Sequence, residues 1–200
     1  MNCWHCENPV EELFCGFCKT LQAPPADFYT IFGIPRTLGL DLNDLQARFY
    51  KLSRVLHPDH YSRKSEMERE CSSQATAKLN DAWRTLRDPV TRAEYVLSQE
   101  GFEAAEQRAK DVPPELLEEV FELNMALEEL RMGDSAARPA LEEARGKFVK
   151  MLDEIDRGLA SLFAKYDLTH DRAVLGEIRG ALNRRGYIRN LVQEVEKELV

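Results

Sequence analysis

The sequence predicts an all-α protein that carries a small metal-binding segment at its N-terminus. Apolar residues recur every three or four positions along several segments, and Gly, Pro and Asp residues separate these segments, as is typical of amphipathic helices. The first 18 residues instead contain four cysteines in two Cys-x-x-Cys pairs. We therefore expect a metal knuckle in residues 1–22, a helical region in 27–100, a hinge in 101–113 and a helical bundle in 114–200.

The composition is that of a globular protein with one or two domains. The chain has 200 residues, 44% of them hydrophobic, and a net charge of −8. No run approaches the ~20 apolar residues of a membrane span. Because the N-terminus shows neither a secretory signal nor an Arg-rich transit pattern, we expect a cytoplasmic, bacterial protein. The acidic charge gives no general footprint for nucleic acid, so we expect neither nucleic acid nor membrane as a partner.

The cysteine pairs predict a metal site. Cys3 and Cys6 form one Cys-x-x-Cys turn, and Cys15 and Cys18 form the second, eight residues after the first. Two such turns facing each other offer four thiolates in a tetrahedron, the ligand set of a structural Zn²⁺ ion. Iron also accepts four thiolates, so the spacing alone leaves the metal open. A segment this short has no core, so the ion would supply its folding energy. We expect His5 to be a bystander.

Four helices are expected in the region 27–100, at about 28–32, 41–56, 66–86 and 89–98. Asp27 and Asp88 precede the first and last of them as caps, and Pro58 limits the second. The third helix should bury one face, which gives the isolated Cys71 a place in the core. The residues of that face are Met67, Cys71, Ala75, Leu79, Ala82 and Leu86.

The loop between the second and third helices carries a stiff polar tripeptide. His57 and Asp59 offer a hydrogen-bond donor and an acceptor on either side of Pro58. They would serve as a docking site or as an acid–base pair, but no nucleophile or Gly-rich phosphate loop accompanies them. The helix before the loop carries a cationic stripe, which is either part of the docking site or a solvated face: Arg48, Lys51 and Arg54.

Three helices with short connections predict an antiparallel bundle after Pro113 and Pro114, with breaks at 133–135 and 167–171. The last helix keeps one apolar phase through Gly186, which indicates a single helix. The first helix has a core seam with alternating spacings of four and three. This seam consists of Leu116, Val120, Leu123, Leu127 and Leu130.

The same helix has a second apolar row outside the seam. Leu117, Phe121 and Met125 lie at i, i+4 and i+8. An exposed apolar row rimmed by acid is typical of a partner surface. The alternative is a wider core face. The acidic residues around the row are Glu118, Glu122, Glu128 and Glu129.

These features resemble a known family. The runs around Asp27–Pro35, Phe49–Arg54 and His57–Asp59 resemble a J-domain, and the pattern over Leu79–Tyr95 looks like the HscB-type co-chaperones of iron–sulfur cluster assembly. The resemblance covers residues 27–200. The cysteine knuckle resembles an extra zinc module of some members.

The resemblance implies a J-domain helical hairpin and a three-helix bundle in an L shape, without enzymatic activity of its own. The J-domain would stimulate the ATPase of a DnaK/HscA-type chaperone through His57, Pro58, Asp59 and the basic stripe. The bundle would bind the iron–sulfur cluster scaffold protein. The residues that match contact positions, or lie where the family carries a contact, are Leu117, Phe121, Glu122, Met125, Glu129 and Tyr187.

Two points qualify the implied sites. Met125 stands where the family carries an acidic residue, which puts the charged part of the scaffold site in question.

Two other protein classes also remain. A general J-protein would serve unfolded clients. The other class is a metal-sensing or nucleic-acid-binding zinc module with a helical tail. Its knuckle would need Lys or Arg residues nearby, but residues 1–26 contain only Lys19.

Overall fold

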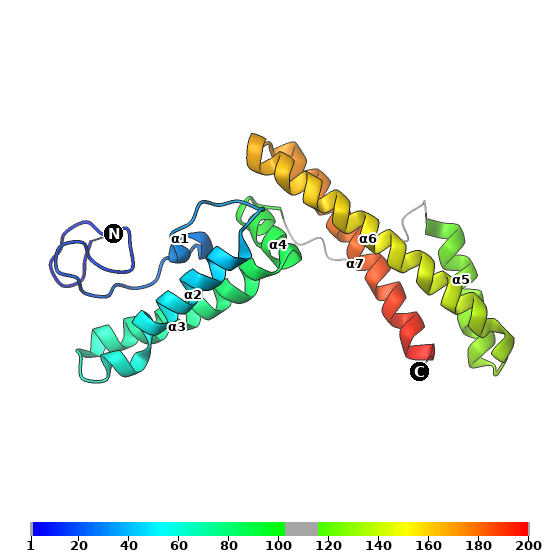
Figure 1. The fold of residues 1–200 in the computed structure, drawn as a ribbon, viewed down its shortest axis with the longest axis horizontal. Helices are drawn as coiled ribbons and strands as arrows, with labels where there is room; N and C mark the ends of the chain where they lie inside the picture. The colour runs from blue at the N-terminus through cyan, green and yellow to red at the C-terminus, as the bar shows by residue number, and fades with distance from the viewer. Residues whose placement is uncertain (1, 103–115, 200) are drawn as a thin grey trace. The chain divides into compact units, whose positions relative to one another are not determined.

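The computed structural model describes residues 2–102 and 116–199, which divide into two compact units at residues 95 and 96. Helices are the regular elements of the described residues in both units. The N-terminal knuckle contains two isolated bridges, Asn2 with Pro9 and Phe14 with Leu21. Figure 1 shows the helices in chain order. Within the described ranges, no helix is long and apolar enough to cross a membrane.

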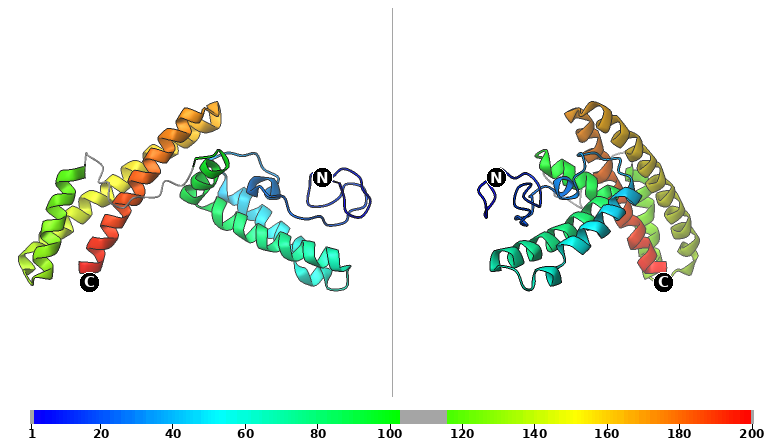
Figure 2. Two further views of the ribbon diagram at one scale, coloured as in Figure 1. Left: turned by 180° about the vertical axis from the view of Figure 1, so that it is seen from behind. Right: turned by 60° about the vertical axis from the view of Figure 1, so that its left-hand side comes forward.

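The first unit is built around two antiparallel helices, α2 (Leu42–Leu56) and α3 (Glu66–Arg87), which lie side by side in Figures 1 and 2. Asp41 caps α2 by accepting two backbone N–H bonds, and a Ser65–Glu68 capping box starts α3. The 3₁₀ turn Pro58–Tyr61 follows α2 directly. The short α1 (Phe28–Phe32) ends at Gly33, whose φ of 63° is in the left-handed region that glycine adopts without strain.

The predicted core face of α3 is confirmed except at its first member. Cys71, Ala75, Leu79, Ala82 and Leu86 are buried, but Met67 is 46% exposed. Met67 lies in the first turn of α3, next to the loop, and the prediction of its burial was wrong. A helical period identifies the side of a helix that faces the core, but not how far along the helix its neighbour reaches.

The fourth helix, α4 (Pro89–Gln99), joins α1 through Tyr95. The Tyr95 hydroxyl accepts the backbone N–H of Phe28 at 2.9 Å and donates to the Asp27 carboxylate at 3.0 Å. The Phe28 and Tyr95 rings stack at 4.5 Å. Burial would raise the pKa of Asp27, but hydrogen bonds from Thr30 and Tyr95 and the charge of Arg36 hold it below its usual value.

The second unit is the predicted antiparallel bundle of α5 (Leu117–Arg131), α6 (Arg138–Thr169) and α7 (Arg172–Leu199). A 3₁₀ turn, Ser135–Ala137, joins α5 to α6. Pro113 and Pro114 lie outside the described residues. The seam of α5 packs into a core with α6 and α7, and α7 continues unbroken through Gly186, as predicted. Thus the apolar phase identified both the number of helices and their inner faces.

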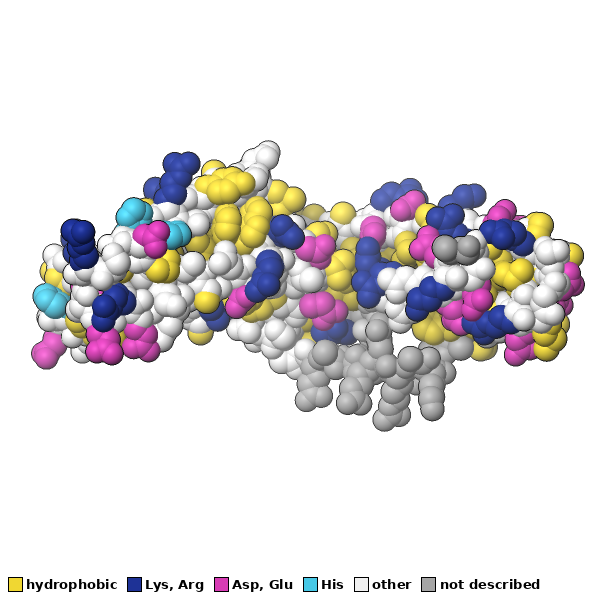
Figure 3. All heavy atoms as spheres, turned by 90° about the horizontal axis from the view of Figure 1, so that it is seen from below, with side chains coloured by type: hydrophobic (Ala, Val, Ile, Leu, Met, Phe, Trp, Pro, Cys, Tyr) yellow, Lys and Arg dark blue, Asp and Glu magenta, His cyan; other side chains and the backbone are white. Residues whose placement is uncertain are grey.

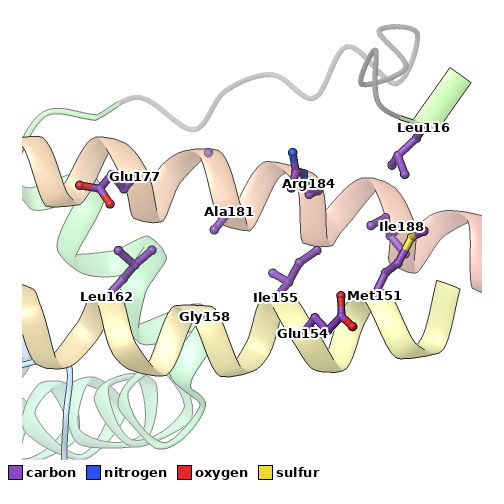
Figure 4. Close-up of a pocket in the computed structure, with 11 residues that line it drawn as sticks. Leu116, Met151, Glu154, Ile155, Gly158, Leu162, Glu177, Ala181, Arg184 and Ile188 are labelled. Atoms are coloured by element: carbon purple, nitrogen blue, oxygen red, sulfur yellow. The ribbon is translucent and has the colours of Figure 1, made fainter. Parts of the chain in front are cut away.

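The long pair α6 and α7 extends beyond the short α5, as Figure 2 shows. A cavity of about 700 Å³ lies between the two long helices. Met151, Ile155 and Leu162 of α6 point toward α7 across it in Figure 4. Ion pairs join the same helices, among them Arg185 with Asp156 at 2.6 Å and Lys165 with Glu177 at 2.9 Å. Arg185, which shares the apolar phase of α7, therefore pairs with a charge on α6.

Candidate functional site

The four N-terminal cysteines converge on one point. Their Sγ atoms all lie within 4.8 Å of one another, with Cys3 3.6 Å from Cys18 and Cys6 3.6 Å from Cys15. Cys3 and Cys15 are buried. The group brings together the four residues that the spacing predicted, and neither His5 nor Cys71 belongs to it. Such an arrangement can hold a tetrahedrally coordinated ion.

The two turns are built alike. In each, the amide four residues after the first cysteine donates to that cysteine's carbonyl, from Glu7 at 3.0 Å and from Lys19 at 2.9 Å. Glu7 and Lys19 have φ values of 61° and 60°, in the left-handed region. Gly16, which offered the obvious flexible position in the sequence, is not among the positive-φ glycines. In each turn, the residue that adopts the left-handed backbone conformation is the one directly after the second cysteine of the pair.

Hydrogen bonds lower the pKa of two of the four thiols, which favours their thiolate forms. A hydrogen bond with the Thr20 side chain lowers the pKa of Cys18 to about 5, and one with the Asn8 side chain lowers that of Cys6. The Cys18 backbone lowers the pKa of Cys15, but burial and the neighbouring sulfur atoms raise it to about 11. Four thiolates at this spacing repel one another, and a divalent cation removes that repulsion. The donor set therefore fits Zn²⁺.

Cys71 is a separate case. It is buried in the core of the first unit, and burial raises the pKa of its thiol, with smaller contributions from Glu70 and Glu68. A buried thiol with a raised pKa is unreactive. Cys71 is therefore a core residue, as its position on the apolar face of the helix predicts.

The tripeptide His57-Pro58-Asp59 is exposed at the end of α2. The His57 Nδ1 atom accepts the Asp59 backbone N–H at 3.3 Å and lies 3.4 Å from the Asp59 carboxylate. The Asp59 side chain is 88% exposed. Figure 3 shows histidine side chains on this unit, with Lys, Arg, Asp and Glu side chains around them. The loop therefore offers a fixed, polar surface to a partner.

Two hydroxyl groups of α3 hold the loop in place, and we did not predict them. Ser72 and Thr76 both donate to the Leu56 carbonyl, at 2.7 and 3.1 Å. Tyr61 donates to the Val55 carbonyl at 3.3 Å. The carbonyls at the end of a helix lack helical partners, so these bonds fix the point where α2 ends and the tripeptide begins. The sequence signal that could have indicated these bonds is a pair of hydroxyl residues four positions apart on the inner side of α3.

The basic stripe is not uniform. Lys51 and Arg54 are exposed. Arg48 is half-buried; it pairs with Asp44 at 2.8 Å and donates to the carbonyls of Phe32 and Gly33. Arg48 therefore also joins α2 to the C-terminal end of α1.

The predicted apolar row on α5 lies at the surface. Leu117, Phe121 and Met125 are 55%, 65% and 49% exposed, whereas the intervening seam residue Leu123 is 1% exposed. The alternative of a wider core face is therefore wrong. Met132, which is 85% exposed, continues the row just after the helix.

The other predicted scaffold contacts divide between α5 and α7. Glu122 and Glu129 are exposed on α5. Tyr187 of α7 is partly buried and packs against the bundle core, where burial, with a smaller contribution from Glu194, raises the pKa of its hydroxyl. Tyr187 therefore supports the bundle core and offers only part of its ring to a partner.

The comparisons with known proteins agree with this geometry. Residues 27–95 match the family model described as the DnaJ domain, and residues 112–196 match the HSCB C-terminal oligomerisation domain. A helical hairpin with an exposed His-Pro-Asp loop, matched in this way, defines the first unit as a J-domain. The chain is thus of the J-domain co-chaperone class.

Individual relatives identify the family within this class. The chain is 30% identical to the mouse iron-sulfur cluster co-chaperone protein HscB, over 88% of this chain and 76% of that protein, and 28% identical to its human counterpart over the same shares. The crystal structure of human HscB aligns with a TM-score of 0.75 and 25% identity, covering all of this chain and 99% of that one. HscB from Vibrio cholerae aligns with a TM-score of 0.59 and 29% identity, over 86% of this chain and 96% of that one. The chain belongs to the HscB family of iron–sulfur cluster co-chaperones.

Proposed function

We propose that this chain binds an iron–sulfur cluster scaffold protein through α5 and presents it to a DnaK/HscA-type chaperone. The J-domain loop then stimulates ATP hydrolysis by the chaperone, which promotes cluster transfer. Hydrolysis takes place in the partner, so the chain is an activator and not an enzyme. None of its five cysteines is in a disulfide, which supports a reducing compartment, and we propose the bacterial cytoplasm.

The observation that carries the scaffold assignment is the exposed row of α5. Three large apolar side chains at helical spacing are about half or more exposed, although the helix already has a complete core seam. Surface rows of this kind, flanked by charge, are typical of protein interfaces. A general J-protein would also need an apolar client surface, so the row supports a scaffold partner together with the match of residues 112–196 to the HSCB C-terminal domain.

The chaperone contact is assigned to the exposed loop of His57, Pro58 and Asp59 with the cations Lys51 and Arg54. Arg48 contributes to the same stripe while also holding α1. Exposed Lys and Arg side chains steer a negatively charged partner surface toward the loop.

The assignment is tested by measuring the ATPase rate of the chaperone with and without the scaffold protein. The wild-type chain should stimulate the rate, and the scaffold should raise it further. Asp59→Asn should abolish both effects, while a Leu117→Ala/Phe121→Ala protein should lose only the added effect of the scaffold. Full stimulation by Asp59→Asn would contradict the J-domain assignment. An unchanged scaffold effect in the double variant, with tight binding of unfolded peptides, would favour the general J-protein.

Zn²⁺ is proposed as the ion of the knuckle, held by Cys3, Cys6, Cys15 and Cys18. The freshly purified, reduced protein should contain about one zinc per chain by elemental analysis. Removing the ion should unfold the knuckle alone, because structural zinc supplies on the order of 10 kcal/mol to sites of this kind while both helical units have cores of their own. Amide exchange checks this, with Cys71→Ser as the control that keeps its metal. Absorption bands of iron–thiolate bonds would overturn the choice of zinc.

A further inference from the structure

A groove between α5 and α6 lies beside the exposed row and shares with the predicted scaffold surface only Glu122. Its volume is about 280 Å³. Small side chains leave it open: Ala126 of α5 faces Ala140 and Ala144 of α6, and Leu123 and Phe148 form the apolar floor. The floor of the groove is therefore apolar.

The rim of the groove is acidic. Glu119 and Glu122 of α5 and Glu143 of α6 line it, with Lys147 as the one basic residue. The Lys147 ammonium group lies 3.2 Å from the Glu143 carboxylate in an ordinary i,i+4 ion pair. Glu119 lies in the first turn of α5, where a negative charge stabilises the helix. Neither the ion pair nor the helix-end position explains the presence of Glu122. The rim as a whole has two more carboxylates than ammonium groups. A cation is the complementary occupant.

The opposite flank of the row differs. There Arg131 is paired with Glu198 at 2.6 Å and lies 3.6 Å from Glu194, so one cation faces two carboxylates. On the flank that faces α6, one cation, Lys147, faces three carboxylates, so this flank is the more acidic of the two. A partner seated on the row therefore meets the greater excess of carboxylates on the side of α6.

We propose that the groove receives one Lys or Arg side chain of the scaffold protein. The aliphatic stem would lie on the alanines and Phe148, and the charged end would reach the carboxylates at the rim, as long cationic side chains do on apolar surfaces. This inference depends on the proposed function, since the groove acts only if the row is the scaffold surface. It assigns two residues beyond the row, Glu119 and Glu143, and fixes the orientation of the partner.

The test is calorimetric titration of the full chain with the scaffold protein at several salt concentrations. Glu119→Gln/Glu143→Gln should weaken binding about tenfold at low salt and reduce its salt dependence, because a charged pair is lost. Ala140→Leu should weaken binding to a similar extent by filling the groove, without affecting the charge. Glu154→Gln, about three turns farther along α6, is the matched control and should bind like the wild type.

A charge exchange identifies the incoming residue. Glu119→Lys should bind weakly to the wild-type scaffold, and one scaffold variant among single Lys→Glu or Arg→Glu changes should restore the affinity. If Phe121→Ala weakens binding while the groove variants bind like the wild type, the inference is overturned and the proposed function stands. If Phe121→Ala also binds like the wild type, the scaffold surface is elsewhere and both are overturned.

Discussion

The α2–α3 loop and the outer face of α5 are both candidate binding surfaces, but they are built in opposite ways. The tripeptide of the loop is exposed, and hydroxyl groups on another helix hold the backbone at its start. The α5 row stands on a rigid helix whose opposite face is the bundle core. The loop therefore depends on residues distant in sequence, whereas the α5 surface depends on side chains that can be replaced one at a time.

The largest expected effect separates the two faces of α5. Leu123→Ala removes a side chain that is 1% exposed and should lower the free energy of unfolding by about 2–5 kcal/mol. Phe121→Ala removes a larger side chain that is 65% exposed, and should change stability by less than about 0.5 kcal/mol. Urea denaturation checks both. Scaffold affinity should fall by about thirtyfold for Phe121→Ala, the usual cost of losing a central aromatic of an interface. A large loss of stability in that variant would place the row in the core.

The next effect concerns the loop. A Ser72→Ala/Thr76→Val protein leaves the Leu56 carbonyl without its two hydroxyl donors, which should cost about 1–3 kcal/mol. The ATPase stimulation per folded molecule should also fall, because the tripeptide begins at the next residue. Ser73→Ala, exposed on the same helix, is the control for both measurements. Unchanged stimulation at reduced stability would show that the loop keeps its position without these bonds.

A smaller effect divides the basic stripe. Arg48→Met removes the donors to the Phe32 and Gly33 carbonyls and should lower the melting temperature by a few degrees, about 1 kcal/mol. Lys51→Glu should leave the melting temperature unchanged and weaken the chaperone contact, most strongly at low salt, because exposed charges are screened within about 10 Å at 0.1 M. Equal effects of the two changes on stability would contradict the different roles assigned to them.

The smallest effect is the pH dependence contributed by Asp27. Its pKa is lowered in the folded state, so the carboxylate contributes stability that is fully present above the pKa of the unfolded chain and is lost as the pH falls through the folded value. The melting temperature of Asp27→Asn should therefore be lower than that of the wild type at pH 7, with the gap narrowing below about pH 4. Thermal unfolding monitored by circular dichroism checks this. A gap that does not change between pH 7 and pH 3 would mean that the charge of Asp27 has no part in it.

Much of the fold could be predicted because the signals are local. The apolar period gave the two faces of α5, and Gly33 and Pro58 gave the ends of their helices. The residues of the candidate metal centre followed from two cysteine spacings. The errors and omissions lie where helices meet. Met67 shares the apolar period of α3 but lies outside the contact, and the dual position of Arg48 depends on where α1 ends.

The sequence by itself determined the helices, their caps, the cysteine pairs and the presence of a surplus apolar row, because each depends on residues a few positions apart. Only the tertiary structure decided which hydroxyls hold the loop, which residues of the knuckle turns take the left-handed conformation, and where Ala126 and Ala144 leave a groove. The physical reason is that these features arise between surfaces brought together from distant parts of the chain. The position of a residue in the helical repeat shows which face of the helix carries its side chain. The residues that contact this side chain are determined by the tertiary structure.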